Sequence, residues 1–87
     1  MFSAYPNPFD RIITFDFTAI HEKVENLSIY NIKGRLIREF TYNDFNNSNI
    51  LNWAGIDLEG TSIPAGIYFY KVETSKTHSI GKIIYLQ

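Results

Sequence analysis

The chain has 87 residues, of which 45% are hydrophobic, 16% aromatic and 20% charged, with a formal net charge of −1 and no cysteine. The balanced charge excludes the basic surface typical of nucleic-acid-binding domains. The lack of cysteine excludes disulfides, thiolate chemistry and cysteine-ligated zinc. This length predicts a single domain, whose small core is filled largely by aromatic rings.

The first predicted element is Tyr5–Phe9, in which Pro6 and Pro8 flank Asn7. Each proline fixes φ, lacks an N–H and pushes the preceding residue toward extended backbone. Both prolines would face the same side of a strand and leave that side without donors. The pattern therefore predicts an extended strand at a sheet edge, able to pair on one side only.

Short runs rich in Val, Ile, Phe and Tyr follow, separated by turns. Alternation places Ile13, Phe15 and Phe17 on one face of the first run. A break in the alternation predicts a bulge or strand start at Asn26. The predicted strands are Ile12–Phe17, Val24–Ile32, Arg35–Phe40, Ile50–Trp53, Gly66–Thr74 and Ile80–Leu86.

The connections are predicted from their turn residues. Gly34 is expected in a left-handed conformation in the tight turn of a hairpin. Asn43–Asn49 is interpreted as a polar loop, Gly55–Ala65 as a turn-rich connector and Ser75–His78 as a turn. No helical periodicity extends beyond one turn. About seven short strands at this spacing predict an all-β, immunoglobulin-like antiparallel β-sandwich with two sheets.

Candidate catalytic and metal-binding groups are sparse. His21 and His78 lie in predicted turns without partners at metal-ligand spacing. Asp57 and Glu59, with Asp44 in the preceding loop, are interpreted as turn residues rather than a calcium loop, which needs denser oxygen ligands. No serine lies in a nucleophile-elbow motif. The sequence therefore predicts neither an enzyme nor a cofactor.

Tyrosines raise the alternative of a binding module that stacks on sugar rings. Alternation in Gly66–Thr74 favours Tyr68 and Tyr70 pointing into the core, because the same face ends in Val72. Tyrosines are also ordinary residues of β-sandwiches, where one edge of the ring is buried and the hydroxyl reaches solvent. The abundant tyrosines considered for such stacking are Tyr30, Tyr42, Tyr68, Tyr70 and Tyr85.

The strand and turn motifs of the chain form an ordered set that spans nearly its whole length. They are YPNPF…ITFDF (Tyr5–Phe17), LSIYNIKGRLIREF (Leu27–Phe40), W-x-G-x-D-x-x-G (Trp53–Gly60), IPAGIYFYKVET (Ile63–Thr74) and GKIIYLQ (Gly81–Gln87). This set closely resembles the type A C-terminal sorting domains of the type IX secretion system of Bacteroidota. It is more distantly similar to the immunoglobulin-like domain of flagellar hook-capping proteins.

The resemblance implies a non-catalytic signal that directs a cargo protein across the outer membrane to the cell surface or the medium. Its implied partners are the translocon, an outer-membrane shuttle protein and a sortase that usually removes the domain, with the cargo linked upstream. Neither a nucleic acid nor a small-molecule substrate is implied. Because Met1 precedes what reads as the middle of a longer protein, we expect residues 1–87 to be one domain from the C-terminus of a larger exported protein.

The family's recognition blocks map onto Pro6, Asn7 and Pro8, onto the start of a strand and onto the last strand. The mapped residues in the two strands are Gly66, Tyr68, Gly81, Lys82, Ile83 and Ile84. Each also has a structural interpretation, which we favour for Gly66 and Tyr68; for the others both interpretations stay open.

Two departures from the family pattern qualify this mapping. Ala54 follows the tryptophan where relatives commonly have an acid, and Lys82 is the sole basic residue of the tail. The main alternative function is an immunoglobulin-like accessory module for adhesion or carbohydrate binding beside an extracellular enzyme. A further alternative is an assembly domain of an extracellular filament.

Overall fold

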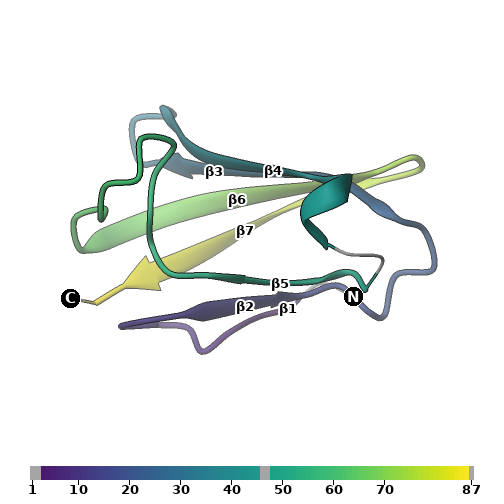
Figure 1. Cartoon of the computed structure of the whole chain (residues 1–87), viewed down its shortest axis with the longest axis horizontal. Coiled ribbons are helices and arrows are strands. Elements are labelled where there is room, and N and C mark those ends of the chain that lie inside the picture. Colours follow the sequence, from purple (N-terminus) through teal and green to yellow (C-terminus); the bar gives the residue numbers. More distant parts are fainter. Residues whose placement is uncertain (1–2, 46–47, 87) are drawn as a thin grey trace.

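Two antiparallel sheets pack face to face in the computed structural model, which describes residues 3–45 and 48–86 (Figure 1). One sheet has the strand order β1-β2-β5 and the other β4-β3-β6-β7. The strands are β1 (Ser3–Tyr5), β2 (Ile13–Asp16), β3 (Val24–Asn31), β4 (Leu36–Thr41), β5 (Ile50–Trp53), β6 (Gly66–Thr74) and β7 (His78–Tyr85). The predicted immunoglobulin-like β-sandwich is confirmed. Among the described residues, no helix has the length and hydrophobicity of a membrane span.

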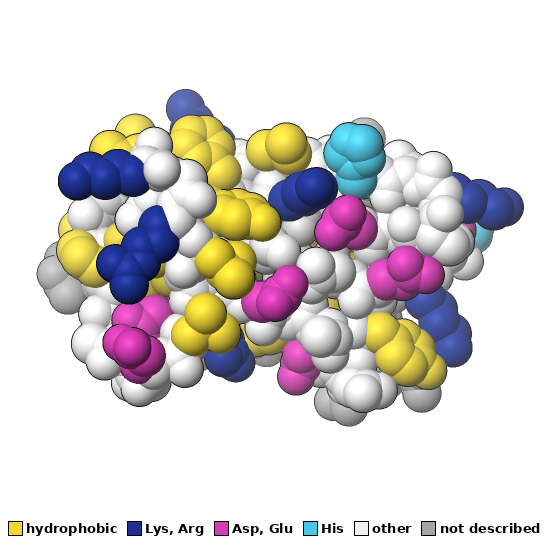
Figure 2. Space-filling model, turned by 90° about the horizontal axis from the view of Figure 1, so that it is seen from above, with side chains coloured by type: hydrophobic (Ala, Val, Ile, Leu, Met, Phe, Trp, Pro, Cys, Tyr) yellow, Lys and Arg dark blue, Asp and Glu magenta, His cyan; other side chains and the backbone are white. Residues whose placement is uncertain are grey.

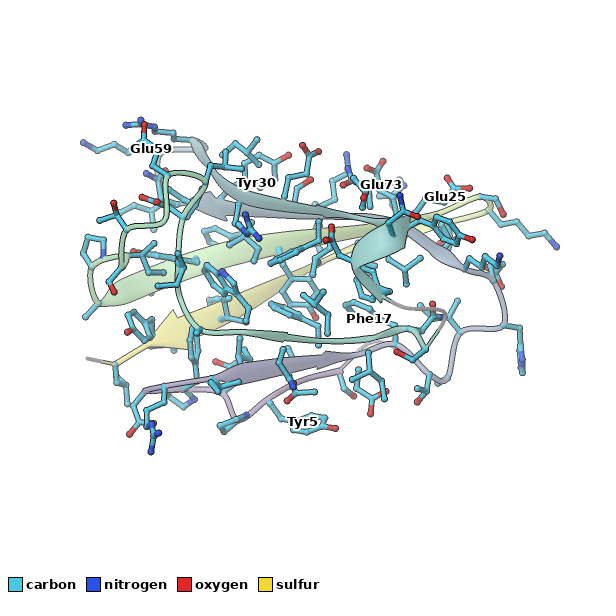
Figure 3. All side chains as sticks on the ribbon, in the orientation of Figure 1. Tyr5, Phe17, Glu25, Tyr30, Glu59 and Glu73 are labelled. Carbon is cyan, nitrogen blue, oxygen red and sulfur yellow. The ribbon has the colours of Figure 1, made fainter. Side chains whose placement is uncertain are left out.

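The core lies between the sheets and comes from alternate residues of each strand. Ile13, Phe15 and Phe17 are fully buried, as their alternation predicts. Tyr68 and Tyr70 are also buried, with 6% and 7% of their surfaces exposed, which confirms their predicted direction. Figure 3 shows Phe17 between the sheets. The buried hydrophobic residues are Phe9, Ile13, Phe15, Phe17, Val24, Leu27, Ile29, Phe40, Phe45, Leu51, Trp53, Ile63, Tyr68, Tyr70, Val72, Ile83 and Tyr85.

The hairpin between β3 and β4 closes through Gly34, whose φ of +80° confirms the predicted left-handed turn. The Asn31 carboxamide oxygen accepts from the backbone N–H groups of Lys33 (2.9 Å) and Arg35 (3.0 Å) and so holds the turn. The pairing of β3 with β6 shifts register between Val24 and Asn26, where the sequence predicts an irregularity. These local features set the register of the four-stranded sheet.

The interpretation of Asn43–Asn49 as a polar loop is wrong at its start. Tyr42–Phe45 forms a short 3₁₀ helix, and the Phe45 ring is 2% exposed and packs 6.3 Å from the Phe17 ring, measured between centroids. A lone aromatic residue among polar neighbours has no periodicity that could reveal its burial. Positions 46 and 47 of the predicted loop lie outside the described residues.

The prediction of one strand over Tyr5–Phe9 is wrong in extent. β1 is an edge strand of the three-stranded sheet, as expected, but it ends at Tyr5, and residues 6–8 form bends. The peptide bonds preceding Pro6 and Pro8 are both cis. Because the prolines cannot donate to a ladder, pairing with β2 stops and the chain crosses to the other sheet. The segment therefore joins the two sheets instead of extending one.

Candidate functional site

The three motif segments from the sequence lie together around the C-terminal half of β7. Residues 6–9 run along the outer edge of this strand, and the start of β6 pairs with its inner edge. We call this region, made of residues 6–9, 66–68 and 81–86, the β7 corner. Segments separated by most of the chain therefore build one continuous surface.

Asn7 joins the first motif to the last through its side chain. Its Nδ2 donates to the Lys82 carbonyl oxygen at 2.9 Å, and its Oδ1 accepts from the Ile84 N–H at 3.0 Å. An amide side chain offers one acceptor and a donor pair, so it can replace the backbone of a neighbouring strand. Asn7 thus caps two outward groups of β7, although its own side chain remains exposed.

Phe9 continues this contact with its main chain. Its N–H donates to the Ile84 carbonyl at 2.9 Å, and its carbonyl accepts from the Leu86 N–H at 2.7 Å, which forms a parallel bridge. The Phe9 ring is 1% exposed and packs on Tyr85 and Trp53, with centroid distances of 4.8 and 6.1 Å. Burial of this ring fixes residues 7–9 against β7.

The start of β6 supports the corner from the other side. Gly66 pairs with Tyr85, and Tyr68 pairs with Ile83. Gly66 has a φ of +154°, which favours glycine, and the Tyr68 hydroxyl donates to the Pro64 carbonyl at 2.5 Å. Burial raises the pKa of the Tyr68 hydroxyl above its usual value. These contacts are consistent with the structural interpretation of both residues.

Gly81 lies under an aromatic ring of the opposite strand. A Cβ atom on Gly81 would lie 2.4 Å from ring atoms of Tyr70, its cross-strand partner. No side chain fits at this position without moving the ring. Along the rest of the segment, Lys82 is exposed, Ile83 is fully buried and Ile84 is half-buried.

The mapped residues therefore divide by exposure. Pro6, Asn7, Pro8 and Lys82 present side chains to solvent. The others shape or pack the corner: Gly66, Tyr68, Gly81, Ile83 and Ile84. The mapping did not include Phe9 or Leu86, whose backbone groups complete the corner. The alternation of Lys82, Ile84 and Leu86 could have indicated a shared outward side, but not its partner.

The carboxylates weighed as calcium ligands are used locally. The Asp57 Oδ1 accepts from the backbone N–H groups of Glu59 and Thr61, each at 2.9 Å, and Asp44 accepts from the Thr41 N–H at 2.8 Å. Across residues 3–45 and 48–86, no three His, Asp or Glu side chains gather as metal ligands would. These hydrogen bonds support the interpretation of both aspartates as turn residues.

Three of the tyrosines considered for sugar stacking are buried: Tyr68, Tyr70 and Tyr85. Their rings pack in the core and cannot form an exposed stacking platform. Tyr42 is 41% exposed, and Lys23 Nζ lies 4.8 Å from the centroid of its ring.

The family model for the secretion system C-terminal sorting domain matches residues 3–86. No curated protein matches the chain significantly. Similar solved structures include PorZ, an essential bacterial surface component of the type-IX secretion system of Porphyromonas gingivalis, with a TM-score of 0.74 and 17% identity. The match covers 99% of this chain and 11% of PorZ.

Dimeric latent PorU from Porphyromonas gingivalis is also similar, with a TM-score of 0.66 and 20% identity over 98% of this chain and 9% of PorU. CopC from Methylosinus trichosporium OB3b has a TM-score of 0.50 and 19% identity over 95% of this chain and 86% of CopC. At these identities the likeness shows a shared fold, and the chain spans about a tenth of PorZ and of PorU. Because the family model covers almost every residue, the chain belongs to the secretion system C-terminal sorting domains.

Proposed function

We propose that this domain is the non-catalytic sorting signal of the type IX secretion system for a cargo protein linked upstream of it. The cargo is carried through the periplasm and across the outer membrane to the cell surface or the medium. The observation that supports this most is the β7 corner, where the motif segments of the family resemblance form one surface. The likeness to PorZ, a surface component of that system, is consistent with the same pathway.

The partners in this proposal are the translocon, an outer-membrane shuttle protein and a sortase that removes the domain. The exposed side chains of Pro6, Asn7, Pro8 and Lys82 are the groups that a receptor would contact directly. Buried members such as Tyr68 and Ile83 act by holding that surface in shape. A receptor that reads this folded surface needs no catalytic residue in the domain.

A secretion assay tests this function. Residues 1–87 are fused to the C-terminus of a fluorescent protein with a Sec signal and expressed in a bacterium with a type IX system. A fusion to one of that host's own sorting domains serves as the positive control. We expect fluorescence at the cell surface or in the medium. Periplasmic retention equal to that of a fusion without the domain, while the host's own signal is exported, would contradict the proposal.

A matched pair of lysine variants asks whether the β7 corner is the surface that is read. Lys82→Glu reverses the charge within the corner, and Lys33→Glu makes the same change in the turn between β3 and β4. We expect export to fall for Lys82→Glu and to stay at the wild-type level for Lys33→Glu. Equal export of the two variants would argue against recognition at the corner.

A further inference from the structure

The outer edge of β7 is only half covered. Ile84 directs its N–H and C=O outward to Asn7 and Phe9, so the period of two along a strand directs the same groups of Ile80 and His78 outward as well. β7 ends the four-stranded sheet. No hydrogen bond from any described residue reaches the outward N–H or C=O groups of His78 and Ile80, or the N–H of Lys82. This leaves a short row of free main-chain donors and acceptors.

An apolar surface adjoins this open edge on the outer face of the sheet. Ile80 is 65% exposed, and Ile67 and Phe69 on β6 are 42% and 36% exposed. Beside them lies a depression of about 490 Å³, lined in part by Tyr30, Phe69 and Ile80. Figure 2 shows hydrophobic side chains gathered over the left half of this face, and in Figure 3 Tyr30 points away from the sandwich. Apolar area next to free backbone groups is what strand addition uses.

Charge indicates what kind of strand fits. Lys82 forms no ion pair with any described residue. In the neighbouring strand, by contrast, Lys71 Nζ lies 3.8 Å from Oε2 of Glu73. A second copy of this chain is a poor occupant. Antiparallel pairing centred on Ile80 would set Lys82 opposite His78, which offers no negative charge. The edge instead fits a strand with an apolar residue opposite Ile80 and a carboxylate opposite Lys82.

We propose that the open half of β7, His78–Lys82, binds an extended segment of a partner protein by strand addition, with an apolar and an acidic side chain of that segment over Ile80 and Lys82. Main-chain hydrogen bonds give the affinity, and the two side chains set the register. The partner's identity as a secretion receptor rests on the proposed function, but the docking chemistry does not.

The binding test uses the purified chain and a capped synthetic peptide, Thr-Glu-Thr-Ile-Thr-Glu-Thr. Amide resonances are followed by NMR during titration. We expect saturable shifts centred on His78–Lys82, and slower exchange of the Ile80 and Lys82 amides. Exchanging both glutamates for lysine should weaken binding about threefold or more, since like charges then face Lys82. Shifts centred elsewhere, no saturable shifts, equal binding of the two peptides, or self-association of the chain through this edge would overturn the proposal.

Two variants of the chain test the docking surface without disturbing the sheet. Ile80→Lys places a charge on the apolar surface, and Ile80→Pro removes an outward N–H that β6 does not use. Ile50→Lys is the matched control, an exposed isoleucine on the edge strand of the other sheet. We expect peptide binding to be lost in both Ile80 variants and kept in the control, with the native amide spectrum retained in all three. Binding by a folded Ile80→Pro variant at wild-type strength would exclude strand addition here.

The same variants in the secretion assay separate the two proposals. Export of the wild-type fusion with equal export of Ile80→Lys and Ile50→Lys would leave the sorting function standing and reject β7 as the receptor edge. Retention of the wild-type fusion alongside specific peptide binding would reject the sorting function and keep the docking chemistry.

Discussion

The two halves of β7 differ in what lies along their outer edge. From Lys82 to Leu86 the edge is hydrogen-bonded by the Asn7 side chain and the Phe9 main chain. From His78 to the Lys82 N–H it faces solvent. Three of the mapped residues, Lys82, Ile83 and Ile84, lie in the closed half. Asn7 is hydrogen-bonded to it, and Gly66 and Tyr68 pair with it. A sequence motif can thus mark the residues that build a surface, while the free main-chain groups lie on the edge beside it.

The prolines explain why the closed half stays closed. Exposed strand edges tend to pair with other chains, and proteins protect them with proline or with covering segments. Here residues 7–9 cover one half of the edge, and Pro6 and Pro8 contribute no N–H through which another strand could extend that cover. The remaining open stretch is short, which limits non-specific pairing.

Removing the ring that anchors the closed half should destabilise the domain more than any other change considered below. Phe9→Ala should lower the free energy of unfolding by about 3–5 kcal/mol, because a fully buried ring leaves a cavity. Urea unfolding measures the loss. Phe69→Ala, at an exposed ring on the outer face, is the control and should cost less than about 1 kcal/mol. Equal losses would mean that Phe9 is not an anchor.

Gly81→Ala should have the next largest effect. It should lower the free energy of unfolding by about 1–3 kcal/mol, because the added methyl group overpacks against the Tyr70 ring. The neighbouring Ile80→Ala, on the opposite face, should stay within about 0.5 kcal/mol of wild type. Thermal or urea unfolding of both variants gives the comparison. A Gly81→Ala variant as stable as Ile80→Ala would contradict the packing described for the junction of the two halves.

Removing the two hydrogen bonds of the Asn7 side chain should lower the free energy of unfolding by a smaller amount. Asn7→Ala deletes two hydrogen bonds and should lower stability by about 1–2 kcal/mol, while Asn7→Asp keeps an acceptor for the Ile84 N–H and should fall between Ala and wild type. Hydrogen exchange of the Ile84 amide should rise most in the alanine variant. If exchange at Ile84 is the same in all three proteins, Asn7 does not close the edge.

The smallest effect on stability at neutral pH concerns Tyr68 and Tyr70, the buried tyrosines of β6. Burial raises the pKa values of Tyr68 and Tyr70 above 10.0, so both are neutral in the fold over a wider range than in the unfolded chain. Their contribution to stability is therefore complete below pH 10 and is lost as the pH rises through the folded-state pKa values. Alkaline unfolding curves should show this fall, and Tyr70→Phe should reduce it. A pH-independent stability above 10 would contradict the burial of these hydroxyls.

Local patterns predicted much of this fold because they report local physics. The alternation of Ile13, Phe15 and Phe17 marked a buried face. The alternation of residues within Gly66–Thr74 placed Tyr68 and Tyr70 inside. The conformation of Gly34 followed from its turn. In each case the deciding neighbours lie within a few residues along the chain.

The contacts of the β7 corner could not be predicted in the same way. Asn7 bonds to Lys82 across a sequence separation of 75, and no local period encodes that partner. The strand predicted through Phe9 ends at Tyr5, because the chain leaves its first sheet to meet β7. At Gly81, the ring of Tyr70 on another strand fills the space that a Cβ atom would need, and no residue near Gly81 in the sequence indicates that ring.

Amide hydrogen exchange from Ile80 to Leu86 distinguishes the open half of the edge from the closed half, residue by residue. The amides of Ile84 and Leu86 are bonded to Asn7 and Phe9, whereas those of Ile80 and Lys82 face the open edge. In the free wild-type chain we predict slow exchange for the first pair and fast exchange for the second, although all four lie on one segment. Equal exchange rates at the four amides would show that the edge is not divided into an open and a closed half.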